Sequence, residues 1–461
     1  AVDERFELPD LHDIVAGGHV DHDTVDLTNV YYDTPEGHLQ TQGILLRRRD
    51  GDEDAGWQLK TPTALGGTEL LWPPTEAPPV SLTDLLTGVG LDKQLTSVAT
   101  IHTVRNRYRI RDPKAKELYA EVADDDVRAW VDERLLAWRE IHVDLGPATD
   151  SMPKRLIVRL RSAGARPSRY PSKLAHVLPQ TAITEPASPA ARALARYLGT
   201  QIDAIVAGDM ALRRGQEPYH DTRVAIRRLR STLRIFGKVM DRSAIGDLDD
   251  ELRWFAGLLG DARDCQVQRR RFTEALDGFA EELILGPVRS RIRNELQSIE
   301  GPARTRLRKA MDSERYLAIM AVLRKWRTDP PVNPDTTTAK LIAKARRARR
   351  KADRRLAAAV TEGDDAMLHQ ARKAAKRARY AAELVKPVRG GKKEKRIIKH
   401  YKGIQSVLGD HQDTVVASAA LRRMALAAGT TVGENGFSYG LLFSREQQIA
   451  QDCRRRARKL V

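Results

Sequence analysis

An internal repeat constrains this chain more than any other feature. The segment HDTRVAIRRLR begins at His220, and HQARKAAKRAR begins at His369, 149 residues later. The same offset separates Gly260-Asp261-Ala262-Arg263-Asp264 from Gly409-Asp410-His411-Gln412-Asp413, so the distance from His to Gly is 40 residues in both copies. Two matches in one register predict a duplicated four-helix unit.

Long helices are expected throughout the part that carries the repeat. A linker is predicted around residues 181–190, with Ser188 as the N-cap and Pro189 at the first position of the next helix. The Ala-, Leu- and Arg-rich sequence beyond it predicts helices near 189–211, 218–239, 248–278, 285–328 with a break at Gly301-Pro302, 336–360, 365–386, 393–424 and 440–460.

The first part of the chain has the pattern of strands. Short runs that alternate between apolar and polar residues are bounded by Gly- and Pro-rich breaks. They predict strands within 30–35, 44–49, 57–60, 103–110, 118–122 and 138–145, and one helix near 81–89. Arg105, Arg107 and Arg109 fall on one face of their strand. We expect an antiparallel sheet that is open or closed.

The charge distribution separates the same two parts. Residues 1–185 carry 22 Lys and Arg against 30 Asp and Glu, a net charge of −8, and residues 186–461 carry 57 against 32, a net charge of +25. A basic domain of this size is typical of proteins that bind a polyanion. No apolar run is long enough to cross a membrane, and there is no secretory signal, so we predict a cytoplasmic protein without membrane association. Cys265 and Cys453 form no metal-binding or disulfide motif.

The repeated helices carry basic stripes. A spacing of 3, 4, 3 and 4 residues places His220, Arg223, Arg227, Arg230 and Arg234 along one side of a helix. The second copy has His369, Arg372, Lys376 and Arg379 in matching positions. Like charges at this spacing repel one another and need counter-charges. Solvent or nearby Asp side chains would satisfy a simple surface helix, whereas two stripes headed by His favour a groove that binds phosphates.

The residue types that lie between the cations indicate which ligand such a groove would bind. Proteins that bind single-stranded nucleic acid place aromatic side chains between basic residues so that bases can stack. These stripes have almost none, and no zinc-finger or RNP-type motif occurs. We therefore favour inorganic polyphosphate or a polyphosphorylated small molecule, and we keep nucleic acid as the less favoured partner.

Both copies resemble the signature helices of the CHAD family, the conserved-histidine α-helical domains. The resemblance covers residues 188–461, with repeats at about 188–330 and 336–461, and includes the Leu-Gly-Asp segments 259–264 and 408–413. It implies two four-helix bundles related by a pseudo-twofold axis around a basic channel that binds long-chain polyphosphate. The residues it points to are His220, Arg223, Arg227, Arg228, Arg230, Arg234, His369, Arg372, Lys373, Lys376, Arg377, Arg379 and Tyr380.

Basic residues and carboxylates also alternate along the predicted strands. Cations facing inward would bind phosphoryl oxygens, and carboxylates would hold Mg²⁺ or Mn²⁺. The alternative is ordinary alternation with the charges facing solvent.

Several of these strands resemble the CYTH family of triphosphate tunnel enzymes over about residues 1–180. The resembling segments include 31–35, 45–49, 59–62, 105–108, 120–125, 138–141 and 171–173. The resemblance implies that triphosphate is bound by Arg47, Arg49, Lys60, Arg105, Arg107 and Lys173, and that the metal ligands are Glu121 and Glu140. The family's opening ExExK strand is absent, and His142 stands where a second Glu is expected.

We therefore expect an α+β protein with an N-terminal antiparallel β tunnel and a C-terminal all-α duplicated bundle. The predicted function is binding of inorganic polyphosphate by the bundle and of triphosphate by the tunnel. The tunnel is an inorganic triphosphatase or polyphosphatase only if the ExExK strand precedes residue 1, and we expect no activity in the chain as given. The alternative is a nucleic-acid-associated or scaffold protein with an inactive tunnel.

Overall fold

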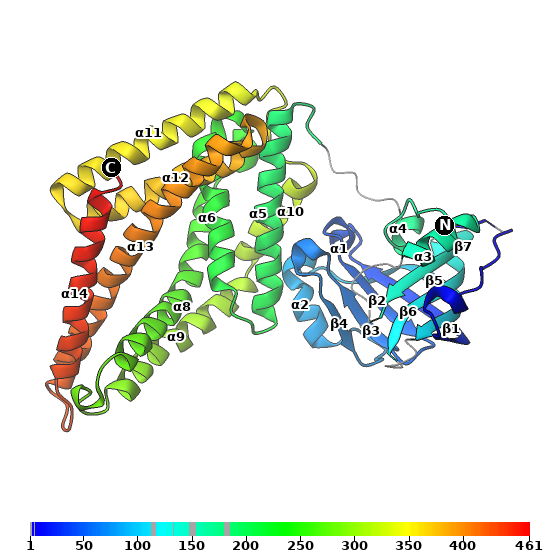
Figure 1. The fold of residues 1–461 in the computed structure, drawn as a ribbon, viewed down its shortest axis with the longest axis horizontal. Coiled ribbons are helices and arrows are strands. Elements are labelled where there is room, and N and C mark those ends of the chain that lie inside the picture. Colours follow the sequence, from blue (N-terminus) through cyan, green and yellow to red (C-terminus); the bar gives the residue numbers. More distant parts are fainter. Residues whose placement is uncertain (1, 4, 112–116, 132, 147–153, 179–184) are drawn as a thin grey trace. The chain divides into compact units, whose positions relative to one another are not determined.

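The computed structural model describes residues 2–3, 5–111, 117–131, 133–146, 154–178 and 185–461. The chain divides into two compact units, 1–182 and 183–461, and Figure 1 shows their elements. The first is built on an antiparallel sheet and the second on helices, which confirms the predicted α+β class. Residues 181–184 of the predicted linker lie outside the described residues.

The first unit contains one antiparallel sheet of seven strands in the order β4-β3-β2-β1-β5-β6-β7. Its strands are β1 (His19–Asp33), β2 (Leu45–Asp50), β3 (Gly56–Lys60), β4 (Glu69–Trp72), β5 (Thr96–Arg111), β6 (Leu118–Val131) and β7 (Arg134–Leu145). The helices are α1 (His38–Thr41), α2 (Val80–Gly90), α3 (Lys154–Ser162) and α4 (Lys173–Val177). The long central strands β1, β5 and β6 fix the register of the candidate site.

The two faces of this sheet have different coverings. Ile110 and Val122 pack on one face with Phe6, Leu11 and residues of α3. On the other face, α4 packs over one end of the sheet against residues of β1, β5 and β6. The middle of that face is polar, because alternate residues of each strand point to the same side. The alternation of residues along the strands therefore makes this face polar in its middle and apolar at the end that α4 covers.

The sheet curls toward its polar face. Arg107 on β5 donates from Nη1 to Asp52 Oδ2, in the loop between β2 and β3, at 2.8 Å, although β1 lies between β5 and β2 in the sheet order. The strands on either side of β1 therefore bend toward each other over the polar face. In the part of the chain that the structure describes, no ladder joins β4 to β7. The tunnel is thus a curled sheet with a gap.

The second unit repeats four helices. The first set is α5 (Pro189–Arg213), α6 (Tyr219–Phe236), α8 (Leu248–Asp277) and α9 (Val288–Met311), and the second is α11 (Thr338–Glu362), α12 (Asp365–Arg389), α13 (Gly391–Ala428) and α14 (Phe437–Arg458). The first residues of α5 and α11, and those of α9 and α14, are 149 residues apart, which confirms the duplication. Within the first set, the single-turn helix η3 (Gly237–Val239) and α7 (Arg242–Ile245) connect α6 to α8. Helix α10 (Glu314–Thr328) follows α9 and lies between the two sets.

One predicted boundary is wrong. The helix expected to break at Gly301-Pro302 continues through Pro302 to Met311, and the break falls at Asp312-Ser313. An interior proline removes one backbone hydrogen bond, but Leu296 and Leu307 on either side remain buried in the core. The new helix begins where Ser313 accepts a hydrogen bond from the Tyr316 backbone N–H. Packing thus outweighs the local signal.

The predicted N-cap at Ser188 is confirmed, since its hydroxyl accepts a hydrogen bond from the Ala191 N–H at 3.0 Å. Both cysteines are buried and free, as the absence of a disulfide motif predicts.

A buried polar contact joins α10 to α5. Asp209 is 0% exposed, and burial raises the pKa of its carboxyl. Arg213 Nε donates to Asp209 Oδ1 at 3.1 Å, and the Tyr316 hydroxyl donates to the same oxygen at 3.0 Å. A buried carboxylate keeps its charge only with such partners.

Replacing Asp209 should therefore destabilise the helical unit. We expect Asp209→Ala to lower the free energy of unfolding by about 3–5 kcal/mol, because it leaves a buried guanidinium short of its partner. Tyr316→Phe removes one hydrogen bond and should cost about 1–3 kcal/mol. Urea denaturation of both variants measures the difference, and equal stability of Asp209→Ala and the parent chain would contradict this interpretation.

Candidate anion-binding sites

The first candidate site lies on the polar face of the sheet. Pairing places Arg105 opposite Asp125 and Asp125 opposite Glu140, while Arg109 lies opposite Glu121 and Glu121 opposite Asp144. These rows cross β5, β6 and β7. The arginines on β5 share one face, as predicted, and each of them faces a carboxylate.

Asp125 is the buried centre of the first row. It is 0% exposed, and Arg105 donates to its two oxygens from Nε and Nη2 at 2.8 and 2.9 Å. Lys173, the first residue of α4, donates from Nζ to Asp125 Oδ2 at 2.7 Å and to Glu140 Oε1 at 2.6 Å. The pKa of Asp125 is lowered because these cations outweigh the effect of burial. Two predicted phosphate ligands therefore share one internal carboxylate.

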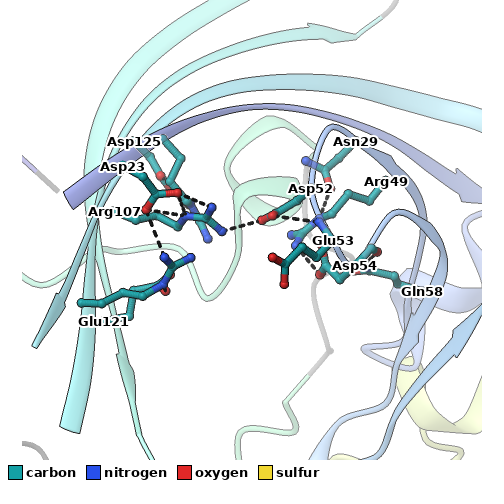
Figure 2. Close-up of polar contacts among 12 residues, drawn as sticks. Asp23, Asn29, Arg49, Asp52, Glu53, Asp54, Gln58, Arg107, Glu121 and Asp125 are labelled. Atoms are coloured by element: carbon teal, nitrogen blue, oxygen red, sulfur yellow. Dashed lines mark hydrogen bonds and ion pairs between the residues drawn. The ribbon is translucent and has the colours of Figure 1, made fainter. Parts of the chain in front are cut away.

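Arg107 is held by two other carboxylates. Its Nη2 donates to Asp23 Oδ2 on β1 at 2.5 Å, and its Nη1 donates to Asp52 Oδ2 in the β2–β3 loop at 2.8 Å. Figure 2 shows this loop reaching toward Arg107. Gly51 makes the approach possible, because its φ is +104° and a Cβ atom there would lie 1.9 Å from the Asp26 carbonyl oxygen.

The predicted ligands on β2 and β3 are also engaged. Arg49 donates from Nη1 to Asp54 Oδ2 at 2.6 Å and from Nε to Asn29 Oδ1 at 3.1 Å, as Figure 2 shows. Arg47 Nε donates to Gln58 Oε1 at 2.8 Å. The Lys60 side chain is exposed, and its Nζ lies 3.1 Å from Glu69 Oε1.

The two predicted metal ligands do not form a metal site. Glu121 accepts a hydrogen bond from Arg109, and Glu140 accepts from Lys173 and from the Trp138 indole N–H. Within the described ranges, no three His, Cys, Asp or Glu side chains come together as a metal would require. Both carboxylates already accept hydrogen bonds from neighbouring cations, so the described residues do not fit Mg²⁺ or Mn²⁺.

The sequence prediction missed Asp23, Asp52 and Asp54. Asp23 lies in the first half of β1, where His19, Asp21 and Asp23 alternate with other residues, and this period-two pattern would have revealed it. The loop residues Asp52 and Asp54 gave no such signal, since their partners depend on the path of the loop.

The second candidate site lies where α6 and α12 pack against each other. Arg223 on α6 and Arg372 on α12 are related by the repeat, and each rests on a glycine of the following long helix. A Cβ atom on Gly260 would lie 3.1 Å from Arg223 Nη2, and one on Gly409 would lie 3.4 Å from Arg372 Nη2. The repeated glycines therefore let the guanidinium groups pack across α8 and α13.

Two further cations meet these arginines. Burial, together with Arg372, Arg227 and Arg223, lowers the pKa of Lys376 to about 6. Arg227 and Lys376 occupy equivalent positions of the repeat, so the four cations form a pseudo-symmetric cluster, which we call the central cluster. Arg227 Nε and Arg372 Nε are buried without a hydrogen-bond partner among the described residues. Such atoms are costly unless a ligand or water satisfies them.

Carboxylates at the border of the central cluster only partly balance it. Arg223 Nη1 lies 3.2 Å from Asp264 Oδ1, at the end of the first Gly-Asp segment. The equivalent Asp413 is half-buried, and burial raises the pKa of its carboxyl.

Other predicted polyphosphate ligands have partners within the protein. Arg230 and Arg234 both bind Asp249 at the start of α8, at 2.9 and 2.7 Å. Arg228 and Arg379 bind Glu383, at 3.1 and 3.2 Å. Tyr380 is buried beneath the guanidinium groups of Arg228 and Arg379.

The remaining predicted ligands differ in exposure. His220 and Lys373 are exposed, and His369 and Arg377 are half-buried. Burial, followed by neighbouring cations, lowers the pKa of both histidines, so both are neutral at pH 7. A neutral imidazole binds phosphate by donating one hydrogen bond rather than through charge.

Comparisons with known proteins agree with this division. The CYTH domain model matches residues 5–134 and the CHAD domain model matches residues 196–422. Two proteins of Mycobacterium tuberculosis, described as uncharacterized proteins MT2285 and Rv2226, are each 34% identical over 471 aligned residues, which cover 94% of this chain and 88% of theirs. The chain belongs to the CYTH–CHAD family.

A solved structure resembles part of this CYTH–CHAD protein in fold. PptA from Streptomyces chartreusis is 22% identical, with a TM-score of 0.50, and the match covers 59% of this chain and 99% of that one. The CHAD domain from the plant Ricinus communis is 24% identical, with a TM-score of 0.49, over 61% and 94% of the two chains. Among the described residues, no helix is both long and apolar enough to cross a membrane.

The CYTH domain allows a test of its acidic loop. Because Asp52 accepts from Arg107 Nη1 while Asp23 holds Nε and Nη2, Asp52→Asn should release the Nη1 donor and strengthen any binding of tripolyphosphate several-fold. Glu53→Gln is the matched control, since it makes the same charge change on the exposed neighbouring side chain. Isothermal titration calorimetry compares the two, and an equal gain in both variants would show only a change of net charge.

Proposed function

We propose that this CYTH–CHAD protein binds inorganic polyphosphate on the central cluster of its CHAD domain. The observation that carries the proposal is the convergence of Arg223, Arg227, Arg372 and Lys376 from two repeated helices, with buried nitrogen atoms left unpaired. Arg presents a planar fork that matches two phosphate oxygens, and Lys adds a compact charge. A phosphate chain passing between α6 and α12 would satisfy both repeats at once.

The surroundings of the central cluster favour a ligand without bases. The aromatic side chains beside it, Tyr219 and Tyr380, are buried and offer no face for stacking. Binding of single-stranded nucleic acid gains much of its energy from stacking on exposed aromatic rings. The cluster offers cations that bind phosphate groups and no exposed aromatic ring for a base.

The CYTH domain is proposed to bind triphosphate on its polar face. Arg47, Arg105, Arg107 and Lys173 face the same side of the curled sheet, and each now contacts a carboxylate or amide of the protein. A triphosphate would have to replace part of these contacts. Because the described residues do not fit a metal, we propose binding of triphosphate at this domain.

Titration of long-chain polyphosphate tests the proposal for the CHAD domain. Arg223→Ala/Arg372→Ala should weaken binding at least tenfold, because both repeats lose a phosphate contact. The control Arg308→Ala/Arg423→Ala removes two exposed arginines of α9 and α13 and should change affinity less than about twofold, as expected of peripheral charges.

Single-stranded DNA and RNA serve as competitors in the same titration. The proposal requires polyphosphate to displace them at equal phosphate concentration. Equal loss of affinity in the two double variants, or stronger binding of nucleic acid by the parent chain, would refute it.

The lowered pKa of Lys376 makes binding depend on pH. At pH 7–9 the free lysine is largely neutral, and a bound phosphate would raise its pKa and draw in a proton. Affinity should therefore fall as pH rises through this window, by up to about tenfold per pH unit. Lys376→Arg keeps the charge at all these pH values and should flatten the profile.

Calorimetry in buffers of different ionisation enthalpy measures the proton uptake directly. The parent chain should take up close to one proton on binding, and Lys376→Arg should take up less. Identical uptake by both would show that Lys376 does not contact the ligand.

A further inference from the structure

The two ends of the central cluster differ although the repeat makes its middle symmetric. Arg228 and Arg377 are equivalent positions at the 149-residue offset. Arg228 Nε donates to Glu383 Oε2 at 3.1 Å, and the Tyr197 hydroxyl of α5 donates to the same oxygen at 3.3 Å. Glu383 therefore partly balances the cations at this end, since Arg379 binds the same carboxylate.

At the other end the equivalent positions are all basic. The residue equivalent to Glu383 is Arg234, and the residue equivalent to Tyr197 is Arg346 on α11. Burial lowers the pKa of Arg377, and the charges of Arg234 and Arg355 lower it further. Asp249 acts in the opposite direction and raises the pKa of Arg377, but this carboxylate is already bound by Arg234. This end has an excess of cations.

Helix α11 increases that excess. Between residues 340 and 355 it carries nine Lys and Arg side chains, and the whole helix has two acidic residues. Its counterpart α5 carries three Arg and two Asp. In the described part of the chain, none of these nine cations forms an ion pair. Asp353, the acidic residue among them, accepts a hydrogen bond from the Tyr401 hydroxyl at 2.6 Å.

A cavity of about 990 Å³ lies between this basic helix and the C-terminal part of α6. Eight of its sixteen lining residues are Lys or Arg, including Lys238, Arg242, Lys344, Arg347, Lys351 and Arg377, and none is acidic or aromatic. Arg355 and its neighbours lower the pKa of Lys351, and burial together with Lys238 lowers that of Lys344. The cations repel one another and are accessible to an anion.

We propose that this cavity binds the segment of a polyphosphate chain that leaves the central cluster. Arg377 belongs to both the signature helix and the cavity wall, so a chain bound between α6 and α12 reaches the cavity without a gap in positive charge. At the opposite end Glu383 pairs with Arg228, which lowers the attraction of that end for a phosphate chain. Long chains therefore leave the CHAD domain on the side of its second repeat. This inference rests on the proposed function.

The chemistry of the cavity fits a phosphate polymer. Every internal phosphate of the polymer carries a negative charge, and the wall supplies cations along its length together with small or aliphatic residues such as Ala343, Ala348 and Ile245. No aromatic ring is available for a base to stack on.

The test removes three cavity cations that lie outside the signature helices. Lys344→Ala/Arg347→Ala/Lys351→Ala should weaken binding of long-chain polyphosphate about tenfold or more. It should also flatten the dependence of log affinity on log salt by about 2, since each lost contact contributes roughly 0.7. The loss should be confined to longer chains in a series of graded length, because the shortest chains occupy the central cluster alone.

The control is Lys340→Ala/Lys395→Ala/Arg423→Ala, which removes the same charge from exposed positions outside the cavity. It should change affinity less than about twofold. Circular dichroism and thermal unfolding establish that both triple variants keep the parent fold.

Four outcomes would overturn the inference. If both triple variants bind long chains equally, or if the cavity variant loses the same factor at every chain length, the cavity does not take the outgoing segment, while the proposed function stands. If the parent chain does not bind polyphosphate, the proposed function and this inference fail together. If the cavity variant loses only single-stranded DNA binding, the surface serves nucleic acid instead.

Discussion

Repulsion among four converging cations governs the CHAD domain. Arg223, Arg227, Arg372 and Lys376 are brought together because α6 and α12 pack against each other, and their partial burial removes the solvent that would screen them. Without a ligand the protein relieves this repulsion by releasing the Lys376 proton. On the proposed function, a phosphate chain would relieve it more fully, since it would bring charge and acceptor atoms to both helices. The energetic cost of bringing these cations together would then favour a multivalent anion as the ligand.

In the CYTH domain, by contrast, the cations of the polar face are paired with carboxylates. Arg105, Arg107 and Lys173 are paired with Asp125, Asp23, Asp52 and Glu140, so the polar face is close to electrically balanced before any ligand arrives. These pairs hold the cations in fixed positions, and they also compete with phosphate for the same donors. Among the described residues, these cations of the polar face are paired, whereas the central cluster contains buried guanidinium nitrogen atoms without a partner.

Periodicity made much of this structure predictable. Alternation with period two placed Arg105, Arg107 and Arg109 on one face, and the 149-residue offset paired the long helices of the CHAD domain. Tertiary contacts decided the rest. The helix break moved from Pro302 to Ser313 because packing kept α9 continuous. The partners of Arg107 and Arg228 were not predictable, because they depend on a loop path and on contacts between distant helices.

Divergence between the two repeats gives the central cluster a direction. A perfectly symmetric duplication would hold a phosphate chain equally well in either orientation and let it leave at both ends. Here one repeat contributes Glu383 where the other has Arg234, and α11 carries cations that α5 lacks. The same backbone symmetry therefore supports an asymmetric electrostatic path. A few charge differences between equivalent helices are enough to make the two ends of the central cluster electrostatically different.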